Sequence, residues 1–357
     1  MLYLATFVLA ALLSFLFTLA VRRLAMRFKI QDAPVGERKQ HVRAVPLLGG
    51  LAPFVAFFGM AFFLIYIKII PTSLASPLVW LSYSAALIML GGFFDDKYSL
   101  PPKRQIWFPL AAIAVAVFYG GTRIHLITNP YGGVLFLIPA VSLVLSFLWL
   151  FIITYTTKIL DGLDGLVSGT VAIGALTIFL FTTLTNFKEA GMSYLAIVLA
   201  GVFIGFLILN YYPVPLRPPF AWSYGAAQQG FAGQAKIFLG EGGSLFAGFI
   251  LGGLAIMTGA KIAVTLMVLA LPLIDLLAVI IKRIIKKKPF WKGDRLHLHY
   301  LLVDRGWKPQ HVVYLFWGLS AAMGLIAVFL PSGGKVASLI LISIIFFAVD
   351  IFGFKEK

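Results

Sequence analysis

The sequence predicts an all-α protein that crosses a membrane about eleven times. Of its 357 residues, 61% are hydrophobic and 12% are charged, against a charged fraction of ~25% in typical soluble domains. So little polar surface could not cover a water-exposed body of this size. Apolar runs close to the ~20 residues that span a bilayer also recur along the whole chain. These observations exclude a soluble globular protein.

Each predicted span is an apolar run bounded by polar or turn-forming residues. The first is expected to remain as a helix and not to be a cleaved signal peptide, because it lacks a basic leader and runs directly into Arg22 and Arg23. No internal repeat or low-complexity linker divides the chain, so residues 1–357 are expected to form one domain. In order, the eleven runs cover residues 2–21, 47–70, 74–94, 105–120, 134–155, 166–185, 194–211, 243–257, 262–281, 312–330 and 336–354.

The basic residues predict the orientation of these spans. The net charge of +16 would suit anionic lipid, nucleic acid or a phosphorylated substrate. With eleven spans, 24 of the 29 Lys and Arg residues fall in the odd-numbered loops or the C-terminus, and cytoplasmic loops carry the positive excess. We therefore expect a multi-pass protein of the inner (plasma) membrane, with its N-terminus outside, its C-terminus in the cytoplasm and no nucleic-acid partner. The absence of Cys excludes disulfides, a thiol nucleophile and a thiolate metal site.

The acidic residues follow the same side, although the positive-inside rule gives no reason for this. Among the 13 acids, Glu189 alone lies clearly outside. The active site is therefore expected in the cytoplasmic loops. Five acids lie at the cytoplasmic ends of spans, namely Asp95, Asp96, Asp161, Asp164 and Glu241.

Each acidic cluster has a structural alternative. Adjacent aspartates at 95–96 would be costly if buried without a cation, but they also suit a solvated helix end. In the D-G-L-D-G segment at 161–165, glycines let the backbone approach a ligand and the following helix start favours phosphate, yet Asp is also an ordinary N-cap residue. Glu241, among glycines, could bind a hard divalent cation or simply favour a helix N-terminus.

The basic segments are equally ambiguous when each is taken alone. The run at 286–288 could determine topology or contact anionic lipid. His297 and His299, two residues apart, share a face only if the segment is extended. Asp275, inside an apolar run, is expected to face the protein interior or an aqueous groove. His41 could meet a diphosphate or lie in a solvated loop.

Taken together, the clusters indicate phosphoryl transfer at the membrane boundary. Carboxylates hold divalent cations, the cations offset diphosphate charge, and basic side chains bind the remaining oxygens. A transporter is the non-enzymatic alternative, because Asp275 and Asp350 lie within apolar runs. It predicts polar groups near mid-bilayer in several spans, whereas these acids gather at one face. A CDP-alcohol phosphotransferase would require a D-G-x-x-A-R signature that the chain lacks.

In this order, the motifs resemble those of the polyprenyl-phosphate N-acetylhexosamine-1-phosphate transferases, glycosyltransferase family 4. The matching segments are H-x-x-x-x-P-x-x-G-G at 41–50, the aspartate pair at 95–96, D-G-L-D-G-L at 161–166, F-x-G-E-x-G-S at 238–244 and D-R-x-H-x-H at 294–299. The pattern is closer to the WecA and TagO branch than to the MraY branch.

The resemblance implies a reaction and its partners. N-acetylhexosamine 1-phosphate would pass from a UDP-sugar resembling UDP-GlcNAc to polyprenyl (undecaprenyl) phosphate, with release of UMP. This would be the first membrane step of cell-envelope polysaccharide synthesis, with Mg²⁺, or Mn²⁺ in its place, as cofactor. Transfer of phospho-MurNAc-pentapeptide is the alternative within the family, and a homodimer is left open.

The resemblance also implies roles for individual residues. Asp95, Asp96, Asp161 and Asp164 would be catalytic. Glu241, Asp96 and Asp164 would bind the metal. The substrates would be bound by His41, Lys97, Lys158, Phe238, Arg295, His297 and His299.

Three positions depart from the family pattern. Lys158 replaces an asparagine, Glu241 an aspartate and Tyr300 a histidine. Glu241 keeps a carboxylate but extends it by one methylene, which could shift a metal. Lys158 changes the local charge, and it could take over part of a metal's role or alter the nucleotide contacts.

Overall fold

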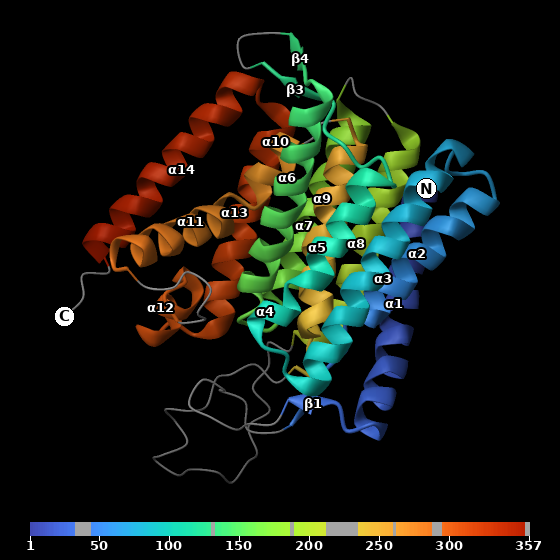
Figure 1. Ribbon diagram of the computed structural model, residues 1–357, viewed down its shortest axis with the longest axis horizontal. Helices are drawn as coiled ribbons and strands as arrows, with labels where there is room; N and C mark the ends of the chain where they lie inside the picture. The colour runs from blue at the N-terminus through green and yellow to red at the C-terminus, as the bar shows by residue number, and fades with distance from the viewer. Residues whose placement is uncertain are drawn as a thin grey trace.

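The computed structural model describes residues 1–32, 44–129, 133–185, 189–211, 235–259, 262–287 and 295–353. Within them the chain is a bundle of long helices with two short hairpin sheets (Figure 1). The strands pair antiparallel, β1 (Gln31–Asp32) with β2 (Val45–Pro46) and β3 (Leu126–Thr128) with β4 (Val134–Phe136). The helices are α1 Leu2–Arg27, α2 Leu51–Tyr66, η1 Thr72–Leu74, α3 Ala75–Tyr98, α4 Pro102–Gln105, α5 Trp107–Phe118, α6 Pro139–Leu160, α7 Leu166–Leu184, α8 Ala190–Asn210, α9 Gly240–Met257, α10 Ile262–Val268, α11 Ala270–Ile285, α12 Leu298–Asp304, α13 Pro309–Phe329 and α14 Ser332–Gly353.

The predicted all-α membrane architecture is confirmed. Every predicted apolar run contains a helix. In the described part of the chain, seven helices are long and apolar enough to cross a membrane, or eight if a bent pair counts as one span. The count of eleven crossings stays a prediction.

The helix bounds differ from the predicted runs by a few residues in several places, and two larger differences have a local reason. Residues 262–281 were expected to form one span, but they contain α10 and α11, which are bent by 75°. Pro272 explains the break, because a proline ring clashes with the carbonyl four residues earlier, here that of Val268, the last residue of α10. The span predicted to begin at 134 instead starts at Pro139, because residues 134–136 form β4.

The bundle has two distinct ends. In Figure 1, α4, α12 and β1 lie at the lower end of the view, and the β3–β4 hairpin and the N-terminus lie at the upper end. We call the lower end the site end, since the acidic segments at 95–96, 161–164 and 241 lie there, at the ends of α3, α6 and α9. The basic loops at 97–104 and 295–308 are at the same end, as the span order predicted.

Close packing of α6 on α9 fixes the geometry at the site end. Ser244, Gly248 and Gly252 are four residues apart and therefore share one face of α9. Thr157 Oγ1 donates a hydrogen bond to the Ser244 carbonyl at 2.8 Å, and Trp149 Nε1 donates to the Gly252 carbonyl at 3.0 Å. A Cβ on Gly248 would lie 2.2 Å from Thr157 Oγ1. Such small-residue stripes let membrane helices approach closely.

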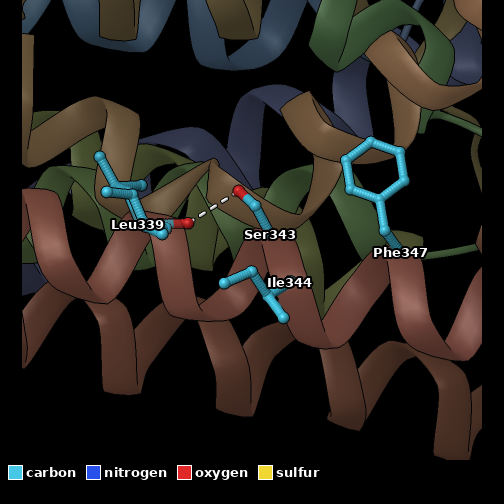
Figure 2. Close-up of a pocket in the computed structure, with 5 residues that line it drawn as sticks. Leu339, Ser343, Ile344 and Phe347 are labelled. Carbon is cyan, nitrogen blue, oxygen red and sulfur yellow. Dashed lines mark hydrogen bonds between the residues drawn. The ribbon is translucent and has the colours of Figure 1, made fainter.

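The outer helix α14 carries a shallow apolar depression of about 450 Å³ (Figure 2). The hydroxyl of Ser343, which lies in it, donates to the Leu339 carbonyl at 2.7 Å and is therefore satisfied within the helix. The surface offers apolar contact, as a lipid-facing helix should, and none of the predicted site residues borders it. Its lining residues are Leu339, Ile340, Ser343, Ile344 and Phe347.

Candidate active site

Three helices bring their backbones together at the site end. A Cβ on Gly50, at the start of α2, would lie 2.1 Å from Gly243 Cα. A Cβ on Gly92, near the end of α3, would lie 2.1 Å from Gly242 Cα. Only glycine permits such approach. It places the aspartate pair at 95–96 directly against the start of α9.

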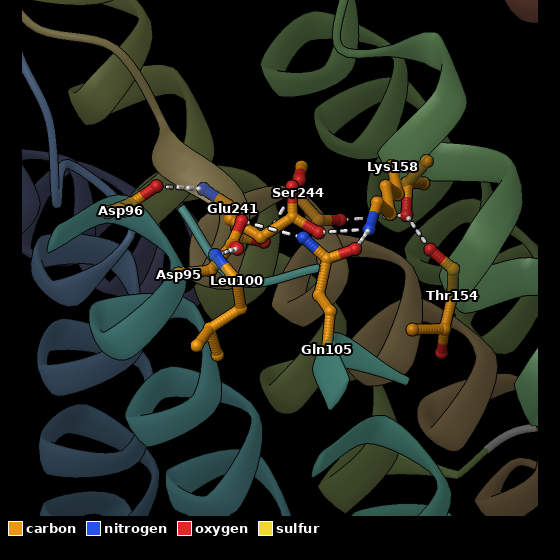
Figure 3. Close-up of polar contacts among 9 residues, drawn as sticks. Asp95, Asp96, Leu100, Gln105, Thr154, Lys158, Glu241 and Ser244 are labelled. Carbon is orange, nitrogen blue, oxygen red and sulfur yellow. Dashed lines mark hydrogen bonds and ion pairs between the residues drawn. The ribbon is translucent and has the colours of Figure 1, made fainter. Parts of the chain in front are cut away.

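Asp96 interacts with the first turn of α9. The backbone N–H of Glu241 donates to Asp96 Oδ1 at 3.0 Å (Figure 3). Gly240 has φ +78°, and a Cβ there would lie 2.5 Å from Asp96 Oδ2. A carboxylate at a helix N-terminus is stabilised by the free N–H groups and by the dipole. This interaction fixes the orientation of Asp96.

A chain of polar contacts runs from Asp95 to Glu241 (Figure 3). Asp95 Oδ1 accepts a hydrogen bond from the Leu100 backbone N–H at 2.8 Å, and its Oδ2 accepts from Gln105 Nε2 at 2.6 Å. Lys158 Nζ, from the last turn of α6, donates to Gln105 Oε1 at 2.5 Å and forms an ion pair with Glu241. A single network therefore links the ends of α3, α4, α6 and α9.

Asn210 holds the D-G-L-D-G loop in place. Its Oδ1 accepts a hydrogen bond from the Gly165 N–H at 3.0 Å, and its Nδ2 donates to the Ile237 carbonyl at 3.1 Å. Gly165 has φ +77°, a conformation that a side chain would strain. Asp164 Oδ2 accepts from the Ala235 N–H at 3.1 Å. The two aspartates of this loop lie in a turn between α6 and α7, not on a helix face.

Phe238 lies in the short non-helical segment that leads into α9. Its N–H donates to the Pro46 carbonyl at 2.9 Å, and its carbonyl accepts from the Gly49 N–H at 3.0 Å. These two hydrogen bonds anchor Phe238 beside β2. In the chain, Leu239 and Gly240 separate it from Glu241. The ring is half-buried.

Negative charge is concentrated around Asp161. Part of its surface stays open to solvent. Desolvation by the protein that lies next to the carboxylate, and then the neighbouring carboxylates Glu241, Asp164 and Asp96, raise the pKa of Asp161 well above its ordinary range. Asp96, Asp161, Asp164 and Glu241 therefore lie close enough to one another to interact electrostatically, while their convergence on one shared active site stays a prediction.

The cluster offers oxygen ligands of the kind that hard divalent cations prefer. Asp96, Asp164 and Glu241 are the residues that would hold such an ion, and the crowded charge around Asp161 fits the presence of a cation. In the residues that the structure describes, no three acids or histidines form a ready-made metal site. Binding would therefore require side-chain movement.

Asp275 orients the start of α12. His297 Nδ1 lies 2.9 Å from Asp275 Oδ2, and the Leu298 N–H donates to Asp275 Oδ1 at 2.8 Å. Asp275 is 5% exposed. The prediction that this acid faces the protein interior is confirmed, and its partner is one of the predicted substrate-binding histidines.

His299 is packed against the D-G-L-D-G loop. It is 1% exposed, and a Cβ on Gly162 would lie 2.4 Å from its Nε2. Its ring is parallel to that of His297, with centroids 5.9 Å apart, so the two histidines do share one face. Burial, together with the charges of His297 and Arg295, lowers the pKa of His299 to about 3. His299 can therefore act as a neutral hydrogen-bonding group near pH 7, but not as a cation.

Arg295 and Lys97, two of the predicted substrate-binding residues, have partners outside the carboxylate cluster. Arg295 forms an ion pair with Asp304, whose hydrogen bonds raise the pKa of the guanidinium. Lys97 lies over the rings of Phe93 and Tyr98, 5.8 and 5.0 Å from their centroids. His41 lies outside the described residues.

Three polar residues have structural roles in the site that were not predicted. Gln105 bridges Asp95 and Lys158, Asn210 holds the loop, and Asp275 orients His297. Gln105 and Asn210 stand at the site ends of apolar runs, and this position is the signal that could have identified them.

Comparison with known proteins agrees with the motif order. The family model described as glycosyl transferase family 4 matches residues 78–259. A probable undecaprenyl-phosphate N-acetylglucosaminyl 1-phosphate transferase of Bacillus subtilis is 28% identical, over 97% of this chain and 89% of its own. A decaprenyl-phosphate N-acetylglucosaminephosphotransferase of Mycobacterium tuberculosis is 27% identical, over 87% of this chain and 79% of its own. A phospho-N-acetylmuramoyl-pentapeptide-transferase of Halalkalibacterium halodurans is 29% identical, over 91% of this chain and 95% of its own.

Proposed function

Because the chain belongs to glycosyl transferase family 4, we propose that it transfers N-acetylglucosamine 1-phosphate from UDP-GlcNAc to polyprenyl phosphate. The observation that carries this proposal is the meeting of five carboxylates and Lys158 at one end of an apolar helix bundle. The arrangement suits a reaction between a lipid-borne phosphate and a nucleotide sugar from water. The names of the Bacillus and Mycobacterium relatives support the same reaction.

In the proposed reaction, a phosphate oxygen of the lipid attacks the β-phosphorus of UDP-GlcNAc in line. The bond from that phosphorus to the bridging oxygen breaks, and UMP leaves. The lipid phosphate is already anionic, so the main work of the protein is positioning and charge stabilisation. Asp96, held by the Glu241 N–H, and Asp95, held by Gln105, would position the nucleophile.

We further propose that Mg²⁺, or Mn²⁺ in its place, is bound by Asp96, Asp164 and Glu241. When bound, the cation would offset the charge of the diphosphate. His297, fixed by Asp275, and neutral His299 would donate hydrogen bonds to sugar or phosphate oxygens. Phe238 would stack on the uracil.

The test is transfer by the purified full-length chain. It is incubated in detergent with undecaprenyl phosphate, Mg²⁺ and UDP-GlcNAc, UDP-GalNAc or UDP-MurNAc-pentapeptide in separate reactions, and UMP and the lipid product are measured by mass spectrometry. We expect lipid-linked pyrophosphoryl GlcNAc and UMP with the first donor. Product from the pentapeptide donor alone would favour the alternative reaction, which the Halalkalibacterium relative suggests.

Variants test the residue roles. Asp96→Asn and Asp164→Asn are each expected to lower kcat by at least ~100-fold, because each removes a charge aimed at the reacting groups. His125→Phe, an exposed position at the opposite end, is expected to match the unmodified protein. Unchanged turnover in both aspartate variants would refute their assignment.

A further inference from the structure

Lys158 places a fixed positive charge inside the carboxylate cluster. Its ammonium pairs with Glu241, donates to Gln105 Oε1 and lies 5.5 Å from the ring centroid of Tyr155. The two paired side chains are only 20% and 18% exposed. Water therefore screens the pair less than it would screen a surface ion pair.

The helices, and not the side chains alone, hold this pair together. Thr157, the residue before Lys158, is hydrogen-bonded to the backbone of Ser244 on α9. Gly248, one turn further along α9, leaves no space for even a methyl group against Thr157. These contacts hold the last turn of α6 against the first turn of α9, and this packing places Lys158 beside Glu241.

A carboxylate that contacts an ammonium is not a free metal ligand. In the described residues Glu241 has this partner while no three acids form a ready-made cation site. We propose that Lys158 is a built-in counter-ion that occupies Glu241 and competes with the divalent cation for it. Lys158 thereby weakens cation binding and sets the concentration of cation that the protein requires. This inference rests on the cation site of the proposed function.

The competing explanation is that Lys158 orients Glu241 for the metal, or that it acts only through its long-range charge. A double-mutant cycle separates these cases. Competition predicts that removing Lys158 improves cation binding only while Glu241 is present. A purely long-range effect predicts the same gain with or without Glu241, and an orienting role predicts a loss.

The experiment measures Mn²⁺ binding to the purified full-length chain without substrates, from the electron paramagnetic resonance signal of free Mn²⁺. Lys158→Met is expected to lower the Kd at least ~10-fold, as removal of a close like charge should. In the Glu241→Gln background, the same substitution should change the Kd less than ~3-fold. Lys103→Met, which removes an exposed charge from the same end, is the matched control and should leave the Kd unchanged.

Equal Kd values for the unmodified protein and Lys158→Met would overturn the proposal, and so would a weaker Kd or an equal gain in the Glu241→Gln background. Should Lys158→Met not fold, Lys158→Gln takes its place, since it can keep the contact with Gln105. A second readout is thermal unfolding. The rise in Tm caused by Mn²⁺ should be larger in Lys158→Met than in the unmodified protein, and an equal rise would count against competition.

These measurements are independent of turnover. If no donor yields a lipid product but the binding cycle behaves as expected, the proposed function fails and the counter-ion role stands. If transfer occurs but the cycle is additive, the counter-ion role fails and the proposed function stands.

Discussion

A carboxylate inside an apolar helix is costly unless its charge is neutralised or hydrogen-bonded. Asp275 on α11 meets this requirement by accepting hydrogen bonds from His297 and from the Leu298 backbone. A partner on one ring nitrogen fixes the tautomer and the orientation of a histidine. The contact therefore makes Asp275 a positioning residue, which sets where the other nitrogen of His297 points.

Asp275→Asn tests this role. The substitution keeps the size of the side chain but replaces one acceptor oxygen with an NH2 group, so it cannot accept hydrogen bonds from both His297 and the Leu298 backbone. The orientation of His297 is therefore weakened. We expect kcat/KM of the proposed transfer to fall ~10–100-fold, as is usual for residues that orient a functional histidine. Glu189→Gln, an exposed acid at the opposite end, is the control. Activity equal to that of the control would show that Asp275 is not a positioning residue.

His299 predicts a pH dependence of stability. The unfolded chain binds a proton at this residue below its ordinary pKa of 6.5, whereas the folded protein binds one only near pH 3. Folding therefore excludes a proton between these values, and stability should fall as the pH drops from 6.5 towards 3. The loss of Tm between pH 7 and pH 4.5 should be smaller in His299→Phe than in the unmodified protein. His125→Phe should lose as much as the unmodified protein, and a similar loss in His299→Phe would contradict the prediction.

Among the elements, the contact between α6 and α9 controls the site. The small-residue face formed by Ser244, Gly248 and Gly252 brings Thr157 and Trp149 into contact with the α9 backbone. It also sets the distance from the end of α6 to the start of α9, and hence the position of Lys158. The packing of α6 on α9 thus determines where the positive charge of Lys158 lies in the site.

Gly248→Ala tests this packing. The new methyl group would lie 2.2 Å from Thr157 Oγ1 and 2.5 Å from the Ile153 carbonyl oxygen, which is backbone and cannot rotate away. Overpacking of this kind costs roughly 1–3 kcal/mol, so Tm should fall. Gly318→Ala, in α13, meets nothing within 4 Å. It should leave Tm unchanged or raise it, because alanine favours helix over glycine by about 1 kcal/mol. Similar Tm values for the two variants would refute the packing role.

On the scale of the whole molecule, acidic and basic segments gather at one end of the bundle and the β3–β4 hairpin lies at the other (Figure 1). The distribution of Lys and Arg predicts that the site end faces the cytoplasm. The lipid phosphate and the nucleotide sugar would then meet at the inner leaflet.

Cysteine labelling tests this orientation, since the chain has no Cys of its own. His125→Cys lies at the hairpin end and Lys103→Cys at the site end, and both positions are exposed. A membrane-impermeant maleimide should label His125→Cys in intact cells and Lys103→Cys only after permeabilisation. The opposite pattern would show that the predicted orientation is wrong.

The sequence by itself determined the fold class and the regions where the helices lie. Transfer of an apolar run into lipid depends on the composition of that run, so local sequence is sufficient to locate the membrane helices. Each span carries the chain to the other end of the bundle, so two motifs separated by an even number of spans share an end. For this reason the gathering of the acids at one end was predictable. The break between α10 and α11 was not predicted, although Pro272 is a local signal for it.

Only the tertiary structure decided which side chains meet. Asp96 and Glu241 are 145 residues apart in the chain, and Lys158 and Gln105 are 53 apart. Their contacts depend on close approach at Gly92 and on the packing of α6 against α9. The sequence showed a lysine where the family pattern it resembles has asparagine, but it could not show that this lysine pairs with Glu241. Pairing depends on distances of a few ångströms between helices, and composition and motif order do not encode such distances.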